Sequence, residues 1–295
     1  MRRSPAMSAP FIGSEAIAAG KITKGQLVGR YARVFRDVYI HPDVELTPAL
    51  RAHAGWLWTK RHGVVAGFSA AALYGSRWVD KTQPVELLHG NRHRLPGIRT
   101  YGDRLEEDEI AVHGGIPVTC PARTALDLGC WYPIAAAVAA IDDLARATDI
   151  TASDVEVLVQ RYPGRRGIAG ARQAIGLFDA GAQSPKESWL RVVLIRAGLP
   201  RPQTQIAVED ECGEVFAYLD MGWDDVKVAV EYDGEQHRTD RWQYTRDVRR
   251  LEMVERLGWI VIRVVVGDRP TDIVRRVRAA LARREFGQLH AGSRM

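Results

Sequence analysis

Residues 220–257 read DMGWDDVKVAVEYDGEQHRTDRWQYTRDVRRLEMVERL, and this stretch decides the fold of the second half of the chain. From Val226 to Asp233, three valines and a tyrosine alternate with charged or small residues, which predicts a strand with one buried face and one exposed, charged face. The Asp-Asp pair just before this run predicts a turn. A four-residue turn there places Asp220 roughly opposite Glu231, because cross-strand partners lie about 5 Å apart.

Acidic side chains and one histidine gather around this predicted hairpin. Asp233 follows Glu231 on the same strand face, and Gly234 lets the chain bend before His237. Carboxylate oxygens are the ligands that Mg²⁺ or Mn²⁺ prefers, and such an ion activates water for attack on phosphate. The pattern therefore predicts Asp220, Glu231 and Asp233 as metal ligands, with His237 as a proton acceptor or phosphate ligand. The alternative is a strand with solvated acids and a histidine at the hairpin exit.

The elements around the hairpin follow the order helix, three strands, helix, strand, helix. Ser184 to Glu187 read SPKE, a capping box with proline at the first helical position. Glu187 is explained by this cap, and it is also a candidate to face the metal site from the helix. The remaining elements are expected at 205–208, 215–223, 226–233, 239–257, 259–266 and 271–284. The apolar run 259–266 predicts a strand buried on both faces.

Arginines on the predicted helix 239–257 form a second candidate group. Arg241, Arg246 and Arg250 are expected to bind DNA phosphates beside the acidic site. Asp247 and Arg250 are three residues apart, so a local ion pair along the helix is the alternative for these two side chains.

Residues 1–150 predict a separate α+β region. Two short helices at 12–19 and 24–31 precede a β segment at 34–40, which is the order of a winged helix-turn-helix. This start carries Lys21, Lys24, Arg30, Arg33 and Arg36. These basic residues form either a DNA-facing surface or an ordinary solvated face. Residues 151–183 predict a helical connector, residues 184–285 the second domain, and residues 286–295 a flexible tail.

Length and composition bound the class of protein. A chain of 295 residues is long enough for two domains with their own cores, and its net charge of +5 mildly favours a polyanionic partner. Three widely spaced cysteines predict neither a zinc site nor a disulfide framework. We find no apolar run of membrane length and no signal peptide, which predicts a cytoplasmic protein without a membrane partner.

Residues 184–285 resemble the very-short-patch-repair-like endonuclease domains, a branch of the PD-(D/E)XK nuclease superfamily. The resemblance rests on Asp220, EYDGEQH at 231–237, RDVRR at 246–250 and LGWIVIRV at 257–264. It implies a restriction-endonuclease-like αβββαβ core and a metal-dependent phosphodiesterase that acts on DNA. Asp220 and Glu231 would then be the metal-binding acids and Glu187 the helix acid. Asp233 stands where that superfamily has a lysine, and His237 is the candidate substitute.

The front region is similar to the AbiEi-type antitoxin regulators. The similar segments are VFRDVYI at 34–40, HGVVAGFSAAALYG at 62–75 and GIPVTCPARTALDL at 115–128. This resemblance implies a winged helix that binds DNA. We expect a Mg²⁺-dependent DNA endonuclease with a targeting or regulatory front region. Two alternatives remain: a non-catalytic DNA-binding regulator built on a degenerate nuclease fold, and a protein whose front region holds a partner toxin.

Overall fold

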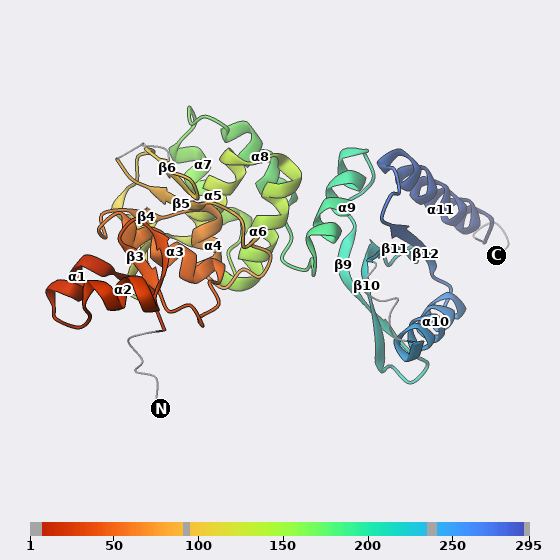
Figure 1. Ribbon diagram of the computed structural model, residues 1–295. Coiled ribbons are helices and arrows are strands. Elements are labelled where there is room, and N and C mark those ends of the chain that lie inside the picture. The colour runs from red at the N-terminus through yellow and green to blue at the C-terminus, as the bar shows by residue number, and fades with distance from the viewer. Residues whose placement is uncertain (1–7, 91–94, 235–240, 292–295) are drawn as a thin grey trace. The chain divides into compact units, whose positions relative to one another are not determined.

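The structure is a computed structural model. It describes the backbone of residues 8–90, 95–234 and 241–291, and the side chains of the same residues except 241–247 and 285–291. The chain divides into two compact units, residues 1–176 and residues 177–295 (Figure 1). Helices and several sheets occur together, so the mixed α/β character predicted from the sequence is confirmed. None of the helices in the described part is long and apolar enough to cross a membrane.

The first unit begins with a small helical segment and a three-stranded sheet. Helices α1 (Gly13–Ala18) and α2 (Lys24–Arg30) precede β2 (Ala32–Phe35) and β3 (Val38–Ile40), and β1 (Phe11–Ile12) pairs with β3. The single β segment predicted here is therefore a hairpin. All five of the basic residues named above for this segment are exposed to solvent.

A five-stranded mixed sheet lies at the centre of the first unit, in the order β6-β5-β4-β8-β7. Its strands and the helices around it are α3 (Pro48–Trp58), β4 (Val64–Val65), α4 (Gly67–Leu73), β5 (Val85–Leu88), β6 (Ile98–Tyr101), β7 (Ile110–His113), β8 (Ile116–Thr119), α5 (Pro121–Trp131) and α6 (Ile134–Thr148). Leu57, Val65, Leu87 and Val118 are among the buried residues of its core.

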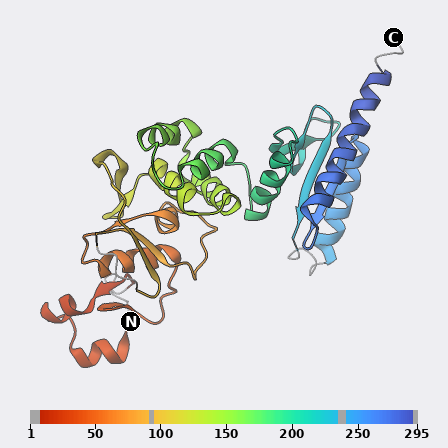
Figure 2. The same ribbon diagram turned by 90° about the horizontal axis from the view of Figure 1, so that it is seen from above.

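Helices α7 (Ala152–Arg161) and α8 (Ile168–Leu177) pack into this first unit, where the sequence had predicted a connector. Buried apolar side chains such as Val155 and Ala171 anchor them, and Figure 2 shows these green helices beside the yellow-green ones. The first unit therefore ends at residue 176 and not at residue 150.

A buried ionic cluster explains why the predicted connector belongs to the first unit. Arg123 of α5 is buried and contacts the carboxylates of Glu109 and Asp127. Arg161 of α7 donates to Glu109 at 2.8 Å, and Arg165 in the following loop donates to Asp127 at 2.7 Å. Buried charges need such partners, so these contacts hold α7 and its loop against α5.

The second unit has the predicted order of helix, three strands, helix, strand, helix. Its elements are α9 (Pro185–Arg196), β9 (Gln203–Glu209), β10 (Val215–Trp223), β11 (Val228–Asp233), α10 (Arg241–Arg256), β12 (Ile260–Val265) and α11 (Pro270–Ala291). The sheet order is β12-β11-β10-β9, with β11 and β12 parallel and the other neighbours antiparallel. Because α11 extends to Ala291, the tail predicted at 286–295 is helical over most of its length.

Helices cover both faces of this sheet. Leu190 of α9 and Ile273 of α11 pack with Val230 on one face, while Val254 of α10 packs with Ala229 on the other. The second face of β11, predicted to be exposed, is therefore buried, and Glu231 on that face is only 8% exposed.

Strand β12 also differs from its prediction. It is the edge strand of the sheet, so from Ile262 onward its side chains alternate between the core and solvent, whereas Ile260 and Val261 at its start are partly buried on the two faces. Ile262 and Val264 face the core, while Arg263 and Val265 are exposed.

Candidate functional site

Strands β10 and β11 separate at the position of Asp220 and Glu231. The hairpin ladder runs from Trp223 opposite Val228 to Met221 opposite Val230. In this register Asp220 follows opposite Glu231, as the predicted turn required. Beyond that point β10 pairs only with β9, and β11 pairs only with β12. The two strands therefore form a fork with both acids at its base.

A glycine allows the strands to approach closely beside the fork. A Cβ atom on Gly222 would lie 2.3 Å from the carbonyl oxygen of Val228 and 2.8 Å from the Cα atom of Ala229. Any side chain there would push the strands apart, so Gly222 keeps the ladder closed up to the fork.

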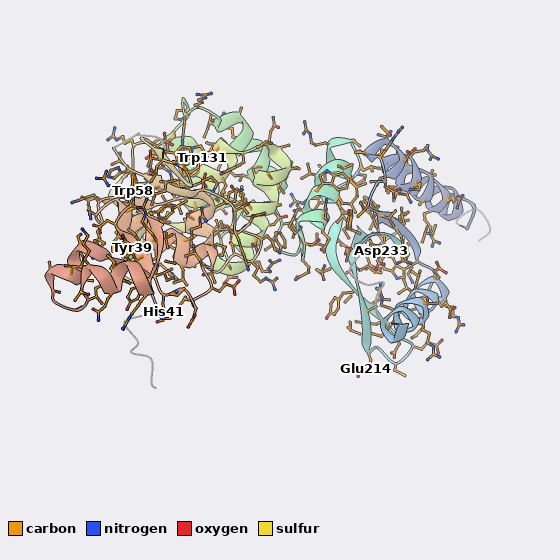
Figure 3. The ribbon with its side chains drawn as sticks, in the orientation of Figure 1. Tyr39, His41, Trp58, Trp131, Glu214 and Asp233 are labelled. Carbon is orange, nitrogen blue, oxygen red and sulfur yellow. The ribbon has the colours of Figure 1, made fainter. Side chains whose placement is uncertain are left out.

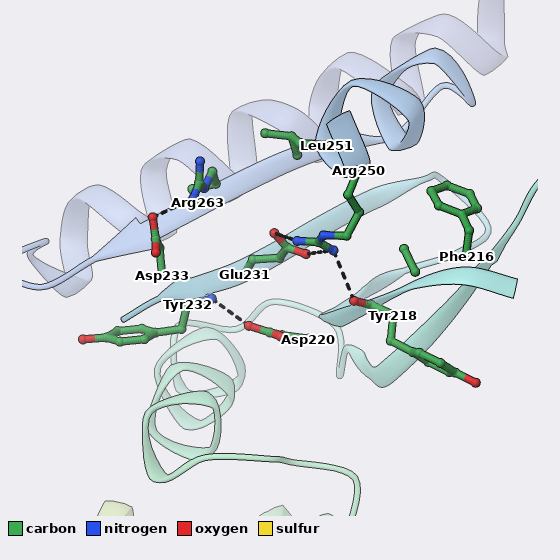
Figure 4. Close-up of a pocket in the computed structure, with 10 residues that line it drawn as sticks. Phe216, Tyr218, Asp220, Glu231, Tyr232, Asp233, Arg250, Leu251 and Arg263 are labelled. Atoms are coloured by element: carbon green, nitrogen blue, oxygen red, sulfur yellow. Dashed lines mark hydrogen bonds and ion pairs between the residues drawn. The ribbon is translucent and has the colours of Figure 1, made fainter. Parts of the chain in front are cut away.

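Asp220 fills the space where the ladder stops. Its Oδ2 atom accepts a hydrogen bond from the backbone N–H of Tyr232 at 2.8 Å, and this N–H has left the ladder (Figure 4). Burial raises the pKa of Asp220 to about 7; the nearby charges of Glu187 and Glu231 raise it as well, against the lowering effects of the Tyr232 N–H and Arg250. The charges of Glu187 and Glu231 therefore add to the cost that burial already places on a charged Asp220.

Glu187 reaches the same region from the first turn of α9. The Ser184 hydroxyl accepts from the Glu187 N–H at 3.2 Å, so the N-cap half of the predicted capping box is present. The Glu187 carboxylate accepts from the backbone N–H of Gln183 at 2.8 Å and from the Gln205 side chain at 3.5 Å. Capping and proximity to Asp220 are therefore compatible, and the two roles predicted for Glu187 do not exclude each other.

Gln205 belongs to β9 at the position that faces Asp220, between two paired positions of the ladder. Its backbone φ is +51°, in the left-handed region that non-glycine residues rarely adopt. Strained backbone of this kind is often found at functional sites.

Glu231 forms a bidentate ion pair with Arg250 of α10. The two guanidinium nitrogens donate to the two carboxylate oxygens at 3.0 and 3.1 Å, and one nitrogen also lies 3.4 Å from the Tyr218 carbonyl oxygen. Arg250 is therefore at the acidic site, as predicted. The side chain of Asp247, its alternative partner, lies outside the described residues.

Asp233, labelled in Figure 3, lies on β11 two residues beyond Glu231 and so farther from the base of the fork (Figure 4). Its Oδ2 atom accepts from Arg263 of β12 at 2.6 Å. Sequence reasoning missed Arg263. Its one signal was a lone charge inside the apolar run 259–266.

A cavity of about 400 Å³ opens between the arms of the fork. We call it the fork cavity; its lining includes Phe216, Asp220, Glu231, Asp233, Arg250 and Arg263. His237 lies outside the described residues. Arg241 and Arg246 belong to α10, but their side chains are also outside the described part.

The donor set fits a hard divalent cation in its chemistry. Asp220, Glu187 and Glu231 carry oxygen ligands, and a cation beside Asp220 would offset the cost of burying its charge. Among the described residues, no three acidic, histidine or cysteine side chains lie close enough together, in their present arrangement, to bind one ion. Glu231 would have to release Arg250 at one oxygen at least. Asp233 fits less well, because its carboxylate is held by Arg263.

Comparison with known proteins gives the family. No family model matches the chain. Two curated proteins of Mycobacterium tuberculosis, "Uncharacterized protein MT2308" (strain CDC 1551 / Oshkosh) and "Uncharacterized protein Rv2248" (strain ATCC 25618 / H37Rv), are each 30% identical over 256 residues. The match covers 87% of this chain and 91% of each relative. The chain therefore belongs to the family of these two mycobacterial proteins.

One solved structure was also found. The crystal structure of the RV2827C protein from Mycobacterium tuberculosis aligns with a TM-score of 0.38 and 15% identity, covering 71% of this chain and 90% of that one.

Proposed function

We propose that the second unit is a restriction-endonuclease-like domain of the PD-(D/E)XK type, which hydrolyses phosphodiester bonds in DNA with Mg²⁺ or Mn²⁺. The observation that carries this proposal is the fork, which places Asp220 and Glu231 opposite each other on two strands, with Glu187 of α9 near enough to raise the pKa of Asp220. The element order and the cavity at the fork support the same conclusion.

Each of the acidic and basic residues at the fork would have its own task. Asp220 and Glu231, with Glu187 beside them, would hold the ion. When bound, such an ion polarises the phosphoryl group and lowers the pKa of water. Arg250 would turn from Glu231 toward a DNA phosphate, since arginine binds carboxylates and phosphates through the same planar fork of N–H groups. His237 stays the predicted proton acceptor.

The first unit would target or regulate this activity. Its first helices and hairpin have the order of a winged helix, and the basic residues on them are exposed. Exposed lysines and arginines attract the DNA backbone without reading its sequence.

A plasmid-nicking assay tests the nuclease. The purified full chain is incubated with supercoiled DNA in Mg²⁺, Mn²⁺ or EDTA, and Asp220→Asn is compared with Asp225→Asn. Asp225 is an exposed acid in the turn after β10 and serves as the matched control. We expect metal-dependent nicking by the wild type and Asp225→Asn, and a loss of at least about a hundredfold in Asp220→Asn. Nicking that survives in Asp220→Asn would exclude this site.

A second candidate is a non-catalytic DNA-binding regulator that keeps the fold as a scaffold. Two observations favour this candidate. Both carboxylate oxygens of Glu231 are bonded to Arg250. Asp233, which is paired with Arg263, stands where the resemblance places a lysine. This candidate predicts DNA binding in EDTA and no cleavage with any divalent ion. Co-purification of a stable protein partner would instead support a toxin-binding role for the first unit.

A further inference from the structure

We propose that Arg263, held in place by Asp233, binds a DNA phosphate in the fork cavity. The inference rests on the proposed function, because it assigns a substrate contact at the same site. The sequence marks Arg263 only as a lone charge in an apolar run, and the pairing of β11 with β12 shows which side chains it lies beside.

The sheet register directs Arg263 toward the acidic site. Arg263 of β12 is the partner of Glu231 in the parallel ladder, so the two side chains leave the sheet on the same face. Both line the fork cavity together with Arg250. Two guanidinium groups therefore flank the cavity, one from β12 and one from α10 (Figure 4).

Stability of the fold does not account for a charge at this position. The core contacts of β12 come from its apolar residues Ile260, Val261, Ile262 and Val264. The Arg263 side chain is 48% exposed while that of Asp233 is 16% exposed. Ion pairs with one partner this open to solvent contribute little to stability. A role in binding gives a better account of an arginine on the wall of a cavity.

The chemistry of the pair suits a phosphate. The guanidinium carries a permanent charge and five N–H donors, and one donor is directed to Asp233 Oδ2 at 2.6 Å. That contact orients the side chain along the cavity wall. Arginine binds phosphate oxygens through paired N–H groups and does not transfer protons near neutral pH, so Arg263 would hold the phosphate. Asp233 is a positioning residue, and its negative charge offsets part of the attraction between Arg263 and the phosphate.

This arrangement predicts opposite effects for the two partners. Arg263→Gln removes the cation and should weaken DNA binding about tenfold. Asp233→Asn keeps an oxygen that can accept from Arg263 but removes the opposing charge, so it should tighten binding about two- to fivefold. If the pair served only the fold, both variants would weaken binding or neither would change it.

The experiment is a fluorescence-anisotropy titration of a labelled DNA duplex with the full chain in EDTA, at several NaCl concentrations. The variants are Arg263→Gln, Asp233→Asn and the control Arg275→Gln, which removes an exposed charge from α11 outside the fork cavity. Thermal unfolding checks that each variant is folded. Arg263→Gln should lower the slope of log K against log salt by about 0.9, the value for one lost phosphate contact.

The outcomes separate this inference from the proposed nuclease. Unchanged affinity and slope in Arg263→Gln, or weaker binding in Asp233→Asn, would overturn the phosphate site even if the wild type cleaves DNA. Opposite shifts in the two variants would support the phosphate site even if no metal gave cleavage. A wild type that does not bind the duplex at all would overturn the phosphate site, and the nicking assay with Mg²⁺ or Mn²⁺ would still decide the nuclease separately.

Discussion

Replacing Asp220 with asparagine should stabilise the protein at alkaline pH and have little effect under acid conditions. An aspartate carboxyl ordinarily has a pKa of 3.8, and that of Asp220 rises to about 7 in the folded chain, chiefly because of burial and then the charge of Glu187. The folded state therefore binds the proton more tightly than the unfolded state. This group favours folding most at low pH, and its contribution falls as the pH rises from about 4 to about 7. Above that range its cost to the folded state is constant.

The size of the effect follows from the two pKa values. Each pKa unit is worth about 1.4 kcal/mol, so a pKa of about 7 in place of 3.8 corresponds to roughly 4 kcal/mol above about pH 8. At about pH 4.5 the folded carboxyl keeps its proton while the unfolded one has lost most of its own, but this pH is less than one unit above the unfolded pKa, so the cost is only about 1 kcal/mol. Asparagine removes the charge while its side-chain oxygen still accepts from the Tyr232 N–H.

Scanning calorimetry of the full chain at about pH 4.5 and about pH 8.5 measures this difference. We expect Asp220→Asn to raise the Tm of the second unit at the higher pH, by about 3 °C for each kcal/mol recovered, and to raise it much less at the lower pH. Asp225→Asn, an exposed acid in the same hairpin, should change neither value. Added Mg²⁺ should raise the Tm of the wild type at the higher pH and leave the Asp220→Asn variant unchanged. A Tm difference that is the same at both pH values would refute the reasoning.

Two further substitutions test how the fork is held. Arg250→Gln leaves Glu231, which is 8% exposed, without its cation and should lower the free energy of unfolding by about 2 kcal/mol. This value is reduced because the Arg250 side chain is partly exposed. Urea unfolding measures the change, and an unchanged midpoint would show that the pair is not formed in solution. Gly222→Ala places a methyl group 2.3 Å from the Val228 carbonyl oxygen and should lower the free energy of unfolding by about 2 to 3 kcal/mol. A urea midpoint equal to that of the wild type would contradict the close approach of the strands.

The part of the site that the sequence predicts is local. The turn after Trp223 and the alternation of the following strand determine which residue faces Asp220, and the structure has the register that places Glu231 there. The Ser184 cap likewise places Glu187 in the first turn of α9. Such relations depend on a few neighbouring residues, so a single sequence contains them.

The remaining features depend on neighbours that are distant in the sequence. The fork exists because β9 and β12 each pair with one arm of the hairpin, and the residues of the hairpin do not predict this pairing. Glu231 is buried because α10 covers its face, so the predicted exposed face was wrong. Arg263 meets Asp233 through a parallel ladder between segments about thirty residues apart. Its register can be read only from the assembled sheet.

The distribution of charge in the fork cavity bears on the choice between the two proposed functions. Glu231 and Asp233 each contact an arginine, which compensates their charge. Asp220 accepts a backbone N–H bond instead, and its raised pKa shows that the surrounding groups do not fully compensate a negative charge there. A binding scaffold gains nothing from a carboxylate that costs stability at neutral pH, whereas a site that recruits a cation does, because stability is commonly traded for activity at such positions. The two proposed functions therefore differ most in the role that they give to Asp220.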